Sequence, residues 1–165
     1  MSRRARGAIV LLGTAALVFV ADRATKLWAE RALADGPVDV IPGVLRLRFT
    51  TNTGGAFSLF TDTPWLFVAA SIVVTVVIVA TAFRERPVLP AIGLGLILGG
   101  AIGNLTDRAT RGDGFTGDVV DFIDVHVWPV FNLADSAIVV GAALLAVWSF
   151  IESRSEPGAE ERVGG

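Results

Sequence analysis

Long apolar runs alternate with polar segments along the chain, and four of these runs are long enough to cross a bilayer core, which needs roughly 20 helical residues. The runs cover residues 7–28, 64–83, 88–105 and 130–151. The pattern predicts an all-α integral membrane protein with four transmembrane helices. We expect a single membrane-embedded domain over residues 1–151, followed by a polar, disordered, cytoplasmic tail over residues 152–165.

The composition supports a membrane protein and excludes several kinds of chemistry. Hydrophobic residues make up 53% of the 165 positions and charged residues 18%, and the mean hydropathy is +0.64, which is unusual for a soluble domain. There is no cysteine, so disulfides, a thiol nucleophile and a thiolate metal site are excluded. The net charge of −2 comes with no basic patch of the kind that nucleic acid requires.

The first apolar run has two interpretations. A basic start, an apolar run and Ala32-Leu33-Ala34 together resemble a cleavable signal peptide. However, the apolar run ends at Ala21, and several charged residues separate it from the small residues. We therefore expect this segment to remain as the first transmembrane helix.

The arginines favour one orientation in the membrane. Arg3, Arg4 and Arg6 directly precede the first span, where the positive-inside bias acts most strongly. Both termini are therefore expected on the cytoplasmic side, which places the segments 36–63 and 106–129 outside.

Polar residues gather at the outer ends of three spans. Each group has the spacing i, i+3, i+4, so its side chains share one helical face. The groups are Asp22, Thr25 and Lys26; Asn104, Asp107 and Arg108; and Asn132, Asp135 and Ser136. Because the spans alternate in direction, all three groups are expected at the same membrane surface, where interfacial capping alone would be the simpler explanation for any one of them.

The first outer loop is predicted to contain a strand. In the segment 44–50, Leu45, Leu47 and Phe49 alternate with polar residues, which is the period of a half-buried strand. We expect a small extracytoplasmic β-sheet between spans one and two. Gly54 and Gly55 follow and allow a sharp bend, either beside a ligand or in an ordinary hairpin turn.

The available side chains favour carboxylate chemistry. The chain lacks a G-x-S-x-G motif, and its single histidine, His126, cannot form a zinc cluster and has no evident serine partner. Two neighbouring aspartates can share a proton and activate a water without metal or cofactor. Asp135 is one candidate, and spacing leaves its partner open. The candidates for that partner are Asp107, Asp113, Asp118, Asp121 and Asp124; apolar neighbours around Asp121 would raise its pKa.

Five motifs in order resemble one family. They are DRATK (22–26), NTGGAF (52–57), GNLTDR (103–108), VVDF (119–122) and FNLADSAI (131–138). This set closely resembles lipoprotein signal peptidase, also called signal peptidase II. The resemblance covers nearly everything except the C-terminal tail.

The resemblance implies an intramembrane aspartic endopeptidase of the bacterial cytoplasmic (inner) membrane. Such an enzyme removes the signal peptide of prolipoproteins before a diacylglyceryl-modified cysteine. Its catalytic aspartates fall on Asp121 and Asp135. Substrate-binding or supporting positions fall on Asp22, Lys26, Asn52, Gly54, Asn104, Asp107, Arg108 and Asn132. The expected partners are prolipoproteins and membrane lipids, with the protein a monomer.

Two other classes compete with this interpretation. Intramembrane carboxylates also mark ion paths, so a small ion- or solute-transporting membrane protein is an alternative, and a non-catalytic scaffold is another. Against transport, the polar groups cluster at one surface and leave the rest of spans two to four apolar. Gly95, Gly99 and Gly103 are better explained by helix packing.

Overall fold

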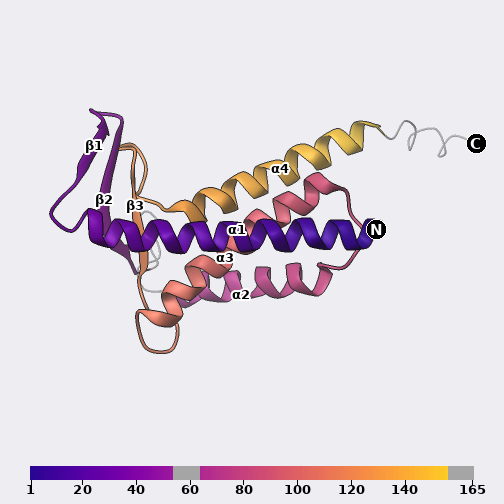
Figure 1. The fold of residues 1–165 in the computed structure, drawn as a ribbon, viewed down its shortest axis with the longest axis horizontal. Coiled ribbons are helices and arrows are strands. Elements are labelled where there is room, and N and C mark those ends of the chain that lie inside the picture. The colour runs from indigo at the N-terminus through magenta and orange to yellow at the C-terminus, as the bar shows by residue number, and fades with distance from the viewer. Residues whose placement is uncertain (54–63, 156–165) are drawn as a thin grey trace, which may run out of the picture.

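The computed structural model describes residues 1–53 and 64–155. Over these residues the chain forms four helices and a small sheet at one end of the helical bundle (Figure 1). The helices are α1 (Arg3–Ala32), α2 (Pro64–Thr81), α3 (Val88–Thr110) and α4 (Leu133–Ser155). The strands are β1 (Val38–Ile41), β2 (Leu45–Asn52) and β3 (Val119–Asp124).

Three of the described helices, α1, α3 and α4, are long and apolar enough to cross a membrane. The fourth, α2, is a shorter apolar helix of 18 residues. The N-terminus and the end of α4 lie together at one end of the bundle, and the sheet lies at the other (Figure 1). Each predicted span contains a helix, and the count of four membrane crossings stays a prediction.

Close contacts through glycine hold α3 against α1 and α4. A Cβ at Gly95 or Gly99 would lie 2.6 Å from a backbone oxygen of α1. A Cβ at Gly141 of α4 would lie 2.6 Å from a backbone oxygen of α3. A Cβ at Gly103 would lie 2.5 Å from Asp22 Oδ2. Packing is therefore confirmed as the role of these small residues, and at Gly103 the missing side chain also makes room for a carboxylate.

The sheet differs from the predicted one because its third strand comes from elsewhere in the chain. The order is β1-β2-β3, with both pairs antiparallel, and β3 lies between α3 and α4 in sequence. The expectation that the sheet is built only between spans one and two was thus incomplete. The run VVDFID is rich in β-branched and aromatic residues, so a strand was recognisable there.

Burial along β2 does not follow the predicted alternation: Leu45, Arg46 and Leu47 are all partly buried, and a regular alternation of the opposite phase begins only at Phe49. Register shifts between Leu47 and Thr50, and Phe49 is exposed while Thr50 is partly buried. The irregularity in the pairing with β3 moves the later side chains to the other face. The grouping of Phe49 with Leu45 and Leu47 was therefore wrong.

The last helix extends beyond its predicted end. α4 continues to Ser155, so the first residues of the predicted tail are helical. Trp148 Nε1 donates to Glu152 Oε2 at 3.0 Å, and the Arg154 guanidinium lies 4.3 Å from the Phe150 ring centroid. These contacts between positions four apart stabilise a polar helical turn that hydropathy alone does not predict. Residues 156–165 lie outside the described part of the chain.

Candidate active site

Asp121 lies in the middle of β3 and is 2% exposed. Pairing of β3 with β2 places Asp121 opposite Thr50, close to the end of β2. Asn52 Nδ2 donates to Asp121 Oδ2 at 3.1 Å, and Asn132 Nδ2 donates to Asp121 Oδ1 at 2.6 Å. Its hydrogen-bonding partners are therefore neutral amides.

Burial, and after it the nearby Asp135 charge, together raise the pKa of Asp121 to about 7, against the lowering effect of the two amide donors. The carboxyl group can therefore keep a proton near neutral pH. This agrees with the prediction that the surroundings of Asp121 raise its pKa.

Asp135 lies in the first turn of α4, and Asn132 fixes that turn. The Asn132 Oδ1 atom accepts from the Asp135 backbone N–H at 2.9 Å, as a residue that caps a helix N-terminus does. The Asn132 amide nitrogen meanwhile donates to Asp121. One buried asparagine therefore connects the helix that carries Asp135 to the strand that carries Asp121.

Asn104 of α3 approaches the same group from the neighbouring helix. Its Nδ2 donates to Asp135 Oδ1 at 2.8 Å, and its Oδ1 accepts from Lys26 Nζ at 2.9 Å. The amide therefore connects Asp135 to a buried ammonium group on α1. The predicted members Asn104, Asn132 and Asp135 are thus brought together.

A second cluster of carboxylates surrounds Lys26. Lys26, Asp22 and Asp107 are fully buried. Lys26 Nζ lies 2.9 Å from Asp22 Oδ2 and 2.9 Å from Asp107 Oδ2, and it donates to Asn104 Oδ1, so two buried carboxylates balance the ammonium charge. Asp22 Oδ1 also accepts from the backbone N–H of Ala134 at 3.0 Å, which ties α1 to the start of α4.

Asp107 has further cationic partners that the motif analysis missed. Arg23 forms an ion pair with Asp107 Oδ1, and Arg111 Nε lies 3.2 Å from the same oxygen. Arg111 also pairs with Glu30 of α1. Arg111 follows Asp107 by four residues, so its pairing was predictable from spacing, whereas the Arg23 contact needs the α1–α3 packing.

Two other loop aspartates, Asp124 and Asp113, have different surroundings. Asp124 pairs with Arg48 at 2.7 Å and accepts from the His126 backbone N–H, which lowers its pKa with Arg48 as a second cause. Asp113 is exposed in the turn after α3. Of the five aspartates left open by spacing, only Asp121 is linked to Asp135 through a shared asparagine in the part of the chain that the structure describes.

The remaining predicted residues have varied positions. Arg108 is 6% exposed, and its Nη1 donates to the Gly117 carbonyl oxygen at 3.2 Å, so it holds the loop after α3. Gly54 lies outside the described residues. Two members of the polar groups, Thr25 and Ser136, donate to carbonyl oxygens of their own helical turns or caps instead of joining the site.

This arrangement can perform acid–base chemistry on a water. A buried carboxyl group that keeps its proton lies beside a second carboxyl group, and amide donors orient both. Among the described residues, no group of three or more His, Cys, Asp and Glu side chains could hold a metal ion.

Comparison with known proteins identifies the family. Residues 14–151 match the family model described as signal peptidase (SPase) II. The chain belongs to the signal peptidase II family. It is therefore an aspartic peptidase, as its motifs predicted, and the ion- or solute-transporting alternative is set aside.

Relatives in the signal peptidase II family match nearly the whole chain. The lipoprotein signal peptidase of Pelotomaculum thermopropionicum is 39% identical over 150 residues, covering 89% of this chain and 95% of the relative. That of Rhodococcus jostii is 43% identical over 145 residues, covering 87% and 73%. A bacterial membrane enzyme solved by the in meso method at 2.3 Å resolution superposes with a TM-score of 0.76 at 25% identity, covering 92% of this chain and 93% of that one.

Proposed function

We propose that the protein removes the signal peptide from diacylglyceryl-modified prolipoproteins, and that Asp121 and Asp135 form its catalytic dyad. The observation that carries this assignment is the asparagine bridge, in which Asn132 contacts the carboxylate of Asp121 and the backbone N–H of Asp135. Cleavage is proposed to occur immediately before the lipidated cysteine.

The raised pKa of Asp121 supports a division of roles in the proposed reaction. Asp135 accepts a proton from a water, and the water oxygen forms a bond to the carbonyl carbon that precedes the cysteine. Asp121 then donates its proton to the amine nitrogen as the carbon–nitrogen bond breaks. The dyad ends with one proton, now on Asp135, so a proton exchange between the carboxyl groups restores the starting state.

We propose that four helices cross the cytoplasmic (inner) membrane of a bacterium, with both termini in the cytoplasm. The sheet and the dyad share one end of the bundle, and the N-terminus and the end of α4 share the other, which supports this topology (Figure 1). The dyad then lies at the extracytoplasmic face. Residues 1–151 form the peptidase domain of a monomer, with a cytoplasmic tail after it.

The supporting residues divide into two proposed groups. Asn52 is the last residue of β2, and Arg108 Nη1 makes a long contact of 3.5 Å with the carbonyl oxygen of the next residue, Thr53. We propose that both side chains approach a bound peptide. Gly54, which follows in sequence, is proposed as a substrate-binding residue because glycine allows close approach of another backbone. Asp22, Lys26, Asn104, Asp107 and Asn132 hold the helices that carry or flank the dyad.

Separate Asp121→Asn and Asp135→Asn substitutions test the dyad. Each removes an acid–base group while keeping side-chain volume, so cleavage of a lipidated prolipoprotein should fall about a thousandfold. The measurement is release of signal peptide by purified protein in detergent, with thermal unfolding recorded on the same samples.

Asp124→Asn is the matched control, because Asp124 lies on the same strand and the chemical change is identical. Its partner Arg48 is exposed, so the lost ion pair is expected to change the cleavage rate by no more than about threefold. Near-normal cleavage by either dyad variant, or a loss in Asp124→Asn as large as theirs, would contradict the assignment.

A further inference from the structure

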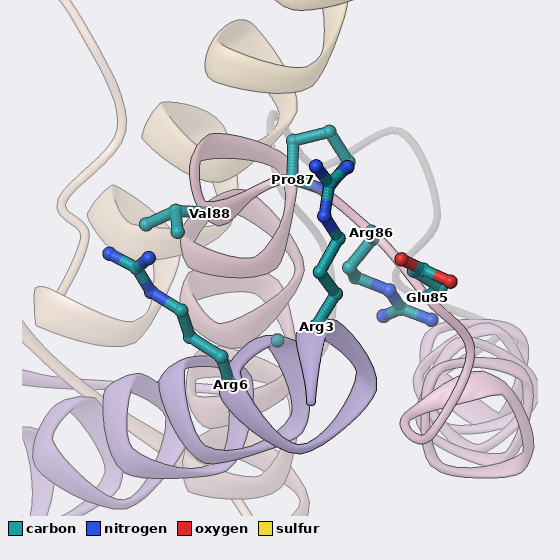
Figure 2. Close-up of a pocket in the computed structure, with 7 residues that line it drawn as sticks. Arg3, Arg6, Glu85, Arg86, Pro87 and Val88 are labelled. Carbon is teal, nitrogen blue, oxygen red and sulfur yellow. The ribbon is translucent and has the colours of Figure 1, made fainter. Parts of the chain in front are cut away.

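A cavity of about 510 Å³ lies at the end of the bundle opposite the dyad. Its walls are the first turns of α1, the segment between α2 and α3, and the start of α3. Figure 2 shows Arg3 and Arg6 rising from α1 toward Pro87 and Val88, with Arg86 on the facing segment. Two parts of the chain some 80 residues apart in sequence therefore bring three arginines around one space.

The positive charge in this cavity is not neutralised locally. Glu85 is the one carboxylate among the described lining residues, against three guanidinium groups. Within the described ranges, none of the ion pairs involves Arg3, Arg6 or Arg86. A concave site with a net positive charge attracts an anion, and guanidinium groups bind phosphate through several parallel hydrogen bonds.

Arg86 is held firmly in this wall and still has an unused donor. Arg86 Nη2 donates to the Thr81 carbonyl oxygen, while Nη1 is buried with no hydrogen-bond partner in the described part of the chain. Burial, with Arg84 nearby, lowers the pKa of Arg86. At Gly7, a Cβ would lie 3.3 Å from Arg86 Cγ, so α1 packs directly on this residue.

Exposed apolar side chains follow the lining residues in sequence on both helices, as is expected where a bound anion is the headgroup of a lipid. Ile9 follows the lining residues of α1 and is 61% exposed, and Leu89 follows those of α3 and is 38% exposed. A headgroup phosphate in the cavity would place its acyl chains along these side chains, whereas a free phosphate ion would leave them uncovered.

We propose that this cavity binds the phosphate of an anionic glycerophospholipid in the leaflet opposite the dyad. The site is distinct from the proposed catalytic centre, which lies at the sheet end of the bundle. A zwitterionic lipid also carries a phosphate, but its ammonium group would add positive charge to a site that already has an excess of it.

The test measures lipid retention by native mass spectrometry of the full-length protein in detergent. Phosphatidylglycerol and phosphatidylcholine with the same acyl chains are titrated in parallel, and inorganic phosphate is added in a third series as a competitor. We expect preferential retention of phosphatidylglycerol. The double variant Arg3→Gln/Arg6→Gln should lose about tenfold in its affinity, since each basic residue near an anionic lipid contributes appreciably to binding.

The matched control is Arg4→Gln/Arg154→Gln, which removes the same charge at the same end of the bundle without changing the described lining residues. It should retain phosphatidylglycerol as the unmodified protein does. Prolipoprotein cleavage in detergent should be unchanged in both double variants, which shows that each is folded. Equal retention in all three proteins, or no preference over phosphatidylcholine, would overturn the proposal. Displacement of the lipid by inorganic phosphate at equal concentration would identify a free-phosphate site instead.

Discussion

Two neighbouring clusters of aspartates have opposite surroundings. Asp22 and Asp107 are buried against Lys26, with Arg23 and Arg111 as further partners of Asp107. Asp121 and Asp135 instead accept hydrogen bonds from the amides of Asn52, Asn104 and Asn132. In the first cluster, cationic side chains neutralise the carboxylates. In the second, the hydrogen-bonding partners are neutral amides, so a carboxyl group can stay protonated. Residue type is the same in both, so the difference lies in the partners, and we propose that the first cluster supports structure and the second supports chemistry.

The largest expected effect that separates the clusters comes from Lys26→Met. Among the described residues, this change leaves Asp22 with the Ala134 N–H as its one remaining partner, and it removes one cation from Asp107. Loss of one partner from a buried ion pair costs roughly 3 to 5 kcal/mol, so thermal unfolding in detergent should occur at a clearly lower temperature.

Arg31→Met is the control for Lys26→Met, because it removes a cation from an exposed position on the same helix. Asp121→Asn should also unfold at a temperature close to that of the unmodified protein, since an amide can replace a protonated carboxyl group. If Lys26→Met and Arg31→Met unfold at the same temperature, the Lys26 cluster does not stabilise the bundle.

The next effect is the pH dependence of stability and of cleavage, which we expect to come from the proposed dyad. The folded pKa of Asp121, about 7, lies above the ordinary value of about 3.9, so the folded state binds this proton more tightly. The resulting stability is fully present below about pH 4 and is lost as pH rises through about 7. In the proposed mechanism catalysis also needs that proton, so kcat/KM should fall up to about tenfold per pH unit above pH 7.

The pH dependence is measured as cleavage of a lipidated peptide between pH 5 and pH 9, with unfolding followed over the same range. Asp124→Asn should show the same profile, because the pKa of Asp124 is lowered and its titration lies well below this range. A rate that stays constant from pH 6 to pH 9 would contradict a shared proton.

The smallest effect is expected from Asn52→Ala. The Asn52 amide favours the ionised form of Asp121, so its removal should raise that pKa and move the alkaline limb of the profile upward by about half a pH unit. Thr51→Ala, at the exposed neighbouring position, should leave the limb unchanged. An unmoved or lowered limb in Asn52→Ala would mean that this hydrogen bond does not tune the dyad.

Much of the architecture was predictable because it depends on local pattern. Apolar runs of span length become helices in any protein that must satisfy its backbone hydrogen bonds without water. The i, i+3, i+4 spacing places Asp22 with Lys26, and Asn104 with Asp107, on shared helical faces. Alternating helix directions then bring these faces to one end. The absence of cysteine from the sequence also excluded a thiol nucleophile and a thiolate metal site.

Tertiary structure supports Asp121 as the proposed partner of Asp135. Spacing left five candidates, and the motif resemblance selected Asp121 without a geometric reason. The choice follows from pairing of β3 with β2 and from the Asn132 bridge to α4, which are contacts between segments far apart in sequence. The ion pair of Arg23 with Asp107 and the arginine-lined cavity likewise depend on helix packing. Sequence periodicity describes one element at a time, whereas charge state and hydrogen bonding in a buried site depend on all the elements that meet there.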